Sequence, residues 1–166
     1  IVSRRQRQMC IRDSLSSDSV AQEKKNYSIS NDETNIVLGT GGSGETKRVP
    51  SRIFLEVMKN TLKRGKCKFF IATGNAKEEI EILDQILKSD LKEFCIPLNN
   101  LNISKIIPII KNCDVSICND SSFSHLSAAL NIPTIVLMAD TPLVYGSYSS
   151  LMHPILPEGA NTVSHD

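Results

Sequence analysis

Short apolar runs alternate with amphipathic segments from residue 35 onward, and this alternation constrains the fold more than any other feature of the chain. The runs are rich in β-branched and aromatic residues, as strands are, whereas the segments between them repeat apolar residues at helical spacing. Parallel strands need long crossovers, which helices supply. We therefore predict an α/β fold, a Rossmann-like parallel sheet with helices on both faces. The predicted strands cover residues 35–39, 67–73, 93–98, 114–119 and 133–139.

Four predicted helices connect these strands, over residues 51–65, 76–88, 102–112 and 122–131. The first follows Pro50, whose missing N–H costs little at the start of a helix. Pro108 stands inside the third helix, where it removes a backbone hydrogen bond. We therefore expect that helix to be kinked or shortened.

The first 34 of the 166 residues differ in character from the rest. They carry scattered charges and serines with neither a strand nor a helix period, so they cannot bury much surface. We predict that residues 1–34 are a disordered or artefactual segment and that residues 35–166 form one domain. The opening VSRRQRQMCIRDS resembles a spurious translation without an initiator methionine. A basic nucleic-acid-binding arm is the alternative interpretation of its arginines.

Overall charge and apolar content exclude several classes of protein. The formal net charge of +1 gives no general attraction to nucleic acid or to an anionic membrane, so any anion site must be local. No apolar stretch reaches the ~20 residues of a membrane helix, and the N-terminus lacks the apolar core of a signal peptide. Five cysteines form no C-x-x-C pair, which favours reduced, buried thiols over a metal or redox role. These features predict a soluble, cytoplasmic protein.

A glycine-rich loop, GTGGSGETKRVP, follows the first predicted strand. Ligands of parallel α/β sheets bind beyond the carboxyl ends of the strands, where this loop begins. Glycines let backbone amides approach a phosphate, and Lys47 would neutralise its charge. The loop matches neither the Walker motif nor G-x-G-x-x-G. From the loop alone, a phosphate site and a flexible turn both remain open.

Two acidic residues, Glu78 and Glu79, fall in the first turn of the second predicted helix. Carboxylates favour the positive end of a helix, which explains them without any ligand. A carboxylate after the second strand also binds sugar hydroxyls in dinucleotide-binding folds. Both interpretations remain open.

A cluster of small polar residues, NDSSFSH, follows the fourth predicted strand. We expect Asp120, Ser121 or Ser122 to cap the helix that follows. The amides and dipole of that helix would form a second anion site at the same edge of the sheet, so a diphosphate would fit between the two. His125 is either a helix-face histidine or a hydrogen-bond donor to phosphate.

The segment after the fifth strand, residues 139–154, is rich in turn-forming residues and has no clear period. We predict a loop over the cleft, or a tail packed back on the domain. Tyr145 and Tyr148 are interpreted as packing residues, with stacking on a base or a sugar as the alternative.

Two motifs together carry a family resemblance: GGSGETKRVP after the first strand and NDSSFSHLSAALNIPTIVL after the fourth, about 75 residues later. From about residue 35 to the end, the chain resembles the C-terminal, donor-binding half of family 9 glycosyltransferases, the lipopolysaccharide heptosyltransferases. The resemblance implies one of the two Rossmann-like domains of a GT-B enzyme, here a nucleotide-sugar (donor) binding domain, with ADP-heptose as the typical donor. Two positions depart from the family pattern: Ser122 replaces a glycine and Val49 an aromatic residue.

The resemblance also assigns roles to individual residues. Gly42, Ser43 and Lys47 would meet the donor diphosphate with Arg48 beside it, and Glu78 or its neighbour would hold the ribose. The side of the donor site opposite the glycine loop would be formed by Asp120, Ser121, Ser122 and His125. Leu101 would lie near the base.

The implied reaction is inverting transfer of a sugar, in which a base activates the acceptor hydroxyl and the nucleoside diphosphate leaves. Lys47 and helix amides would stabilise the leaving charge without a metal or other cofactor. The implied partners are ADP-heptose or another nucleotide-sugar, and a glycan or lipid-linked acceptor held by an N-terminal domain. No nucleic acid is expected, and the full enzyme would associate peripherally with the inner face of the inner membrane.

The catalytic carboxylate belongs to the N-terminal half in this family, and we expect that half to be missing here. The prediction is therefore a glycosyltransferase fragment that binds nucleotide without turnover. A non-catalytic nucleotide-binding or interaction module is the alternative. A nicotinamide-dependent oxidoreductase would explain the glycines and the acidic pair, but it leaves Lys47 and the D-S-S-x-x-H segment without a role.

Overall fold

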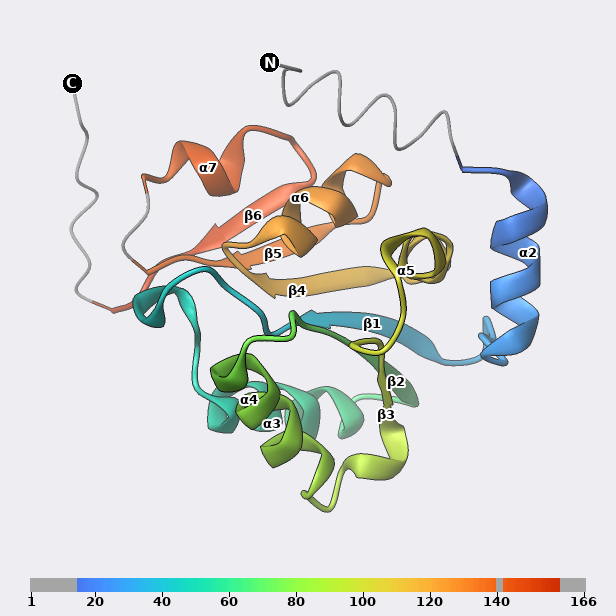
Figure 1. Ribbon diagram of the computed structural model, residues 1–166, viewed down its shortest axis with the longest axis horizontal. Helices are drawn as coiled ribbons and strands as arrows, with labels where there is room; N and C mark the ends of the chain where they lie inside the picture. The colour runs from blue at the N-terminus through green and yellow to red at the C-terminus, as the bar shows by residue number, and fades with distance from the viewer. Residues whose placement is uncertain (1–14, 140–141, 159–166) are drawn as a thin grey trace.

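The computed structural model describes residues 15–139 and 142–158, which build a six-stranded sheet with helices on its faces (Figure 1). The strand order is β3-β2-β1-β4-β5-β6, and every neighbouring pair is parallel. The predicted Rossmann-like α/β class is thereby confirmed. The strands are β1 Thr34–Gly39, β2 Cys67–Ala72, β3 Cys95–Pro97, β4 Val115–Asn119, β5 Thr134–Leu137 and β6 Met152–Ile155.

Two apolar cores lie on opposite faces of the sheet. Side chains alternate along a strand, so Ile36 and Leu38 of β1 pack with α3 and α4, whereas Val37 packs with α5 and α6. No described helix is long and apolar enough to cross a membrane. The helices that cover the sheet are α3 Ser51–Leu62, α4 Lys77–Leu87, α5 Ile103–Lys111 and α6 Ser122–Ala129, with short 3₁₀ turns η1 at Glu45–Lys47 and η2 at Lys92–Phe94.

The expected shortening of α5 by Pro108 is not observed. The helix includes Pro108 and continues to Lys111. The hydrogen bond that a proline cannot make would end on the carbonyl of Ser104, which lies in the exposed first turn. Water can solvate that carbonyl, which keeps the cost of the missing bond low.

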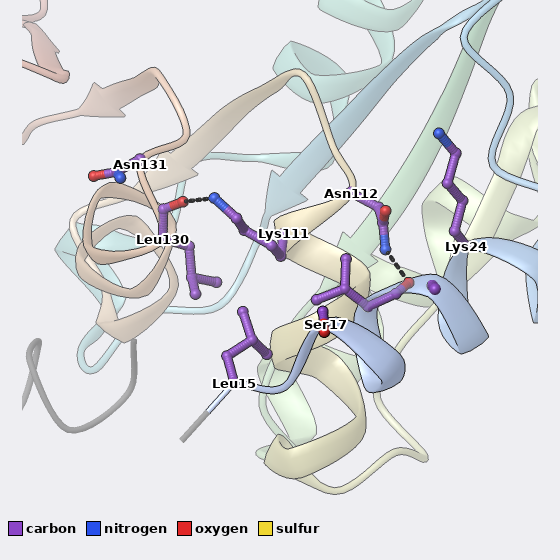
Figure 2. A pocket seen from close by; sticks show the side chains of 9 residues that line it. Leu15, Ser17, Lys24, Lys111, Asn112, Leu130 and Asn131 are labelled. Atoms are coloured by element: carbon purple, nitrogen blue, oxygen red, sulfur yellow. Dashed lines mark hydrogen bonds between the residues drawn. The ribbon is translucent and has the colours of Figure 1, made fainter. Parts of the chain in front are cut away.

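Residues 17–26 form a helix, α2 (Ser17–Asn26), where the sequence predicted disorder. Ser16 caps it, since its hydroxyl accepts a hydrogen bond from the amide of Ser19 at 3.1 Å. The side chain of Asn112 donates to the carbonyl of Val20 at 2.8 Å (Figure 2). The predicted disorder over residues 1–34 is wrong for α2, because polar contacts with α5 replace the apolar stripe that α2 lacks. Residues 1–14 lie outside the described part.

The C-terminal segment forms helix α7 (Val144–Ser147) and the edge strand β6, not an irregular loop. The strand pairs with β5 on one side only, so the missing N–H of Pro154 is tolerated there. Buried Met152 contributes to a small third core under α6. The alternative prediction, a tail packed back on the domain, therefore describes this segment better.

The four described cysteines carry free thiols, and three of them are buried. Burial raises the pKa of Cys95 and of Cys118 to about 11 each. It also raises the pKa of Cys67 and Cys113, with the nearby Glu33 and Asp114 carboxylates adding to the effect. These thiols stay protonated at neutral pH, in line with the predicted structural role. Cys10 lies outside the described residues.

Candidate functional site

The carboxyl ends of β2, β1 and β4 lie side by side in the sheet, and their loops converge there. This edge includes the point where the strand order reverses, between β1 and β4 (Figure 1). Parallel α/β sheets bind ligands in the crevice at such a point. The glycine loop, defined here as residues 40–50, leaves β1 at this edge and is bounded by β2 and β4.

Asn119, the last residue of β4, ties the glycine loop to that strand. Its fully buried side-chain amide donates to the carbonyls of Thr40 at 2.9 Å and Gly41 at 3.4 Å. Its side-chain oxygen accepts from the amide of Val49 at 3.4 Å. Both ends of the loop are therefore fixed by one residue. Asn119 was not predicted as a site residue, because its partners are backbone groups that leave no pattern in the sequence.

Glu79 holds the middle of the loop from the side of β2. One carboxylate oxygen accepts from the amide of Gly42 at 2.9 Å, and the other accepts from the amide of Ala76 at 3.2 Å. A Cβ on Gly41 would stand 2.6 Å from this carboxylate, and one on Gly74 would overlap it, so a side chain at either position would push Glu79 away from the loop. Of the two glutamates left open by the sequence, Glu79 lies at the loop, whereas Glu78 is exposed.

A cavity of about 500 Å³ opens between the glycine loop, the turn after β2 and the start of α6. Five of the predicted donor-site residues line it: Gly42, Ser43, Arg48, Ser121 and Ser122. Leu101 does not line the cavity, since it packs against the core beneath α5. The apolar ring of Phe123 lines the cavity, although it was not predicted to do so. An apolar residue after D-S-S is typical of a side chain that packs a helix against the core.

No side chain caps the first turn of α6 with a hydrogen bond to its backbone amides. Ser121 occupies the N-cap position, but its hydroxyl makes no hydrogen bond to the helix. The expected position of the cap is therefore confirmed at Ser121, but the expected capping hydrogen bond is not formed. Uncapped amides and the helix dipole give this end of α6 a partial positive charge next to the cavity.

A chain of polar contacts runs beside the cavity, from the glycine loop to the C-terminal segment. Lys47 pairs with the carboxylate of Asp120 at 3.1 Å, and the other oxygen of that carboxylate lies 3.9 Å from Nε2 of His125. Nδ1 of His125 lies 3.0 Å from the hydroxyl of Tyr148. The two sequence motifs therefore meet in space, as predicted. Lys47, Asp120 and His125 flank the cavity without lining it.

Three buried hydroxyls gather at the same edge without a hydrogen-bond partner in the described part of the chain. They belong to Thr40, Thr73 and Ser121, each within two residues of the end of β1, β2 or β4. The fourth such atom among the described residues, Oδ1 of Asn35, lies near the opposite edge. Unpaired buried hydroxyls cost free energy, so their concentration here makes this edge a candidate binding site.

A second groove, of about 600 Å³, lies between α2 and the C-terminal ends of α5 and α6 (Figure 2). Lys111 lines it and donates to the carbonyl of Leu130 at 2.9 Å, which satisfies the end of α6. The residues at this groove precede β4 and β5, so they lie at the amino edge of the sheet. None of the predicted donor residues is among them.

Comparisons with known proteins point to one family. A sequence model of glycosyltransferase family 9 (heptosyltransferase) matches residues 5–154. Lipooligosaccharide heptosyltransferase 2 of Haemophilus influenzae is 31% identical over 105 residues, which are 61% of this chain and 30% of the relative. Lipopolysaccharide heptosyltransferase 1 of Campylobacter coli is 27% identical over 138 residues, 79% of this chain and 39% of the relative. The chain therefore spans well under half of either relative.

Solved structures show the same fold. The E. coli ADP-heptose lps heptosyltransferase II superposes with a TM-score of 0.69 at 21% identity, over 87% of this chain and 44% of that protein. The E. coli heptosyltransferase WaaC with ADP gives a TM-score of 0.67 at 18% identity, over 78% of this chain and 40% of that protein.

Proposed function

The chain belongs to glycosyltransferase family 9, the heptosyltransferases, and on that premise we propose that it binds the nucleotide-sugar donor of a heptosyl transfer. The donor would be ADP-heptose, and the acceptor a lipopolysaccharide-core or similar glycan. The observation that carries this proposal is the meeting of the glycine loop with the start of α6, where Lys47 lies 3.1 Å from Asp120. Solved relatives with ADP and with ADP-2-deoxy-2-fluoro heptose support the choice of nucleotide.

In the proposed complex, the diphosphate lies between the glycine loop and the uncapped amides of α6. Lys47 supplies the positive charge, and α6 supplies amides and its dipole. Arg48 donates to the carbonyl of Gly42 at 3.1 Å, so its first effect is on the shape of the loop. Glu79 is the better candidate than Glu78 for the ribose hydroxyls, because it lines the cavity.

During transfer, these groups act on the departing nucleoside diphosphate. Negative charge grows on the β-phosphate as the glycosidic bond breaks, and Lys47 with the α6 amides stabilises that charge. The acceptor hydroxyl needs a base, and both carboxylates of this site are engaged: Glu79 by two amides and Asp120 by Lys47. We therefore expect this chain alone to bind the donor without transferring the sugar, with inversion at the anomeric carbon in the complete enzyme.

Isothermal titration of the 166-residue chain with ADP tests the proposal. We expect micromolar to millimolar affinity, and a loss of about 10- to 100-fold in Lys47→Ala, as expected for one hydrogen bond to a charged group. Lys66→Ala is the matched control, because Lys66 precedes β2 at the opposite edge of the sheet and is exposed. A folded chain that takes up no ADP, or equal losses in both variants, would overturn the proposal.

A further inference from the structure

Tyr148 lies directly against His125. The two ring centroids are 5.4 Å apart with an interplanar angle of 30°, and the hydroxyl oxygen lies 3.0 Å from Nδ1. Tyr148 follows α7, 23 residues after His125, so the contact joins the C-terminal segment to α6. From the sequence, Tyr148 was predicted to pack in the domain or to stack on a base or a sugar.

The other ring nitrogen of His125 faces a carboxylate. Nε2 lies 3.9 Å from Oδ1 of Asp120, whose Oδ2 is paired with Lys47. An ionised carboxylate only accepts hydrogen bonds, so the favourable arrangement places a hydrogen on Nε2. A neutral imidazole then has a lone pair on Nδ1, and the hydroxyl of Tyr148 is placed to donate to it.

We propose that Tyr148 is a positioning residue for His125: its hydroxyl donates to Nδ1 and thereby fixes the tautomer with hydrogen on Nε2, directed at the Asp120 and Lys47 side of the site. Without this hydroxyl, only the Asp120 carboxylate, 3.9 Å from Nε2, still favours that tautomer, so part of the population carries the hydrogen on Nδ1 and the ring can rotate about its last bond. The stacked ring alone limits tilting of the imidazole but does not select a tautomer.

The benefit of this positioning role depends on the proposed function, the binding of a nucleotide-sugar donor. His125 would offer an N–H to the donor beside the ammonium of Lys47, in a region where Asp120 is 6% exposed. A fixed donor costs no reorganisation when the leaving charge develops. Tyr148 would thus act on the diphosphate only through His125.

Long-range ¹H–¹⁵N correlation spectra of the ligand-free 166-residue chain test the tautomer. The sequence has three histidines, so loss of one signal set in His125→Gln assigns the ring. We expect hydrogen on Nε2 and an unprotonated Nδ1 in the native chain, and a tautomer mixture in Tyr148→Phe. Tyr27→Phe, a hydroxyl deletion next to α2, should leave the pattern unchanged. Hydrogen on Nδ1 in the native chain, or an unchanged pattern in Tyr148→Phe, would overturn the proposal.

ADP titration then tests whether Tyr148 acts through His125. Tyr148→Phe should weaken ADP binding by about 2- to 10-fold, the worth of one hydrogen bond, but should have no further effect in a His125→Gln background. An equal loss in both backgrounds would show that Tyr148 acts independently and would end the proposal. If the native chain binds no ADP, the proposed function fails, while the spectra still decide the relation between the two rings.

Discussion

Lys47 and Asp120 are separated by 73 residues along the chain, yet they form an ion pair of 3.1 Å across the edge of the sheet. The carboxylate is 6% exposed and the ammonium 27%, so solvent screens the pair only in part. In the ligand-free protein, Asp120 therefore holds the cation that we assign to the diphosphate. An incoming diphosphate must share Lys47 with this carboxylate or displace it.

Replacing Asp120 by asparagine should strengthen the binding of ADP. The variant keeps the shape of the side chain but removes a negative charge that competes for Lys47 and repels the phosphates. We expect a gain of about 2- to 5-fold, the usual worth of a partly screened ion pair. Isothermal titration at low and high salt measures the gain. Asp84→Asn, on the exposed side of α4, is the control. Weaker ADP binding in Asp120→Asn would mean that the carboxylate contacts the nucleotide itself.

Asn119→Ala should destabilise the fold and loosen the glycine loop. The substitution leaves the carbonyl of Thr40 and the amide of Val49 without their side-chain partner, which costs about 1–3 kcal/mol. Urea unfolding measures this loss. Asn60→Ala, exposed on α3, should change the free energy of unfolding by less than about 0.5 kcal/mol. Equal effects of the two substitutions would refute the clamping role of Asn119.

Glu79→Gln and Glu78→Gln should distinguish the roles of the two neighbouring glutamates in stability and in ADP binding. A glutamine at position 79 accepts with one oxygen only, so either the Gly42 amide or the Ala76 amide loses its partner. We expect Glu79→Gln to lower the free energy of unfolding by about 1–2 kcal/mol and to weaken ADP more than inorganic pyrophosphate, which has no ribose. Glu78→Gln serves as the control and should match the native chain in both measurements. The reverse ranking would reassign the ribose to Glu78.

The thiol of Cys118 should make the protein less stable at alkaline pH. Burial raises its pKa to about 11 from 9.0, although the Ser116 hydroxyl and the Gly39 backbone act in the opposite direction. Below pH 9 the thiol is protonated in both states. Between pH 9 and 11 the unfolded chain loses the proton first, so the free energy of unfolding falls as pH rises, by at most about 1.4 kcal/mol per pH unit.

Urea unfolding at several pH values checks the effect of this thiol. Cys118→Ala should show a shallower decline between pH 9 and 11 than the native chain, because the titrating group is gone. Ile117→Val, the neighbouring position in β4, removes a methylene without changing any titrating group and should keep the native slope. Identical slopes in all three proteins would show that Cys118 does not contribute.

The strands β1 to β5 and the helices between them follow from local pattern, which is why the sequence predicts them. The edge strand β6 carries no such signal, because it is short and contains Pro154, which is tolerable only where one side of a strand is unpaired. Helix α2 was missed for a different reason. Its one buried residue is Glu23, which pairs with Lys105 at 3.2 Å, and a charged contact of this kind depends on the tertiary fold.

Candidate-site residues could be predicted where a residue type suited to phosphate binding stands in a loop after a strand, as for Gly42, Lys47 and Asp120. The choice between Glu78 and Glu79 was not, because adjacent residues of a helix point about 100° apart and the sequence does not set the rotation of the helix about its axis. Tyr148 was open for a related reason: the path of the chain after β5 decides what its ring meets. Local pattern thus specifies the elements, whereas their mutual orientation selects the contacting side chains.

The pairing of β1 with β4 also determines when the site can exist during synthesis. The bond from Asn119 to Thr40 spans 79 positions, and the loop cannot acquire it until the later strand is available. A nascent chain that ends after β3 already carries every glycine of the loop and Glu79, which holds its middle, but it lacks Asn119, which fixes both ends of the loop. The complete loop arrangement therefore forms late on the ribosome, in the same step as the joining of the two halves of the sheet.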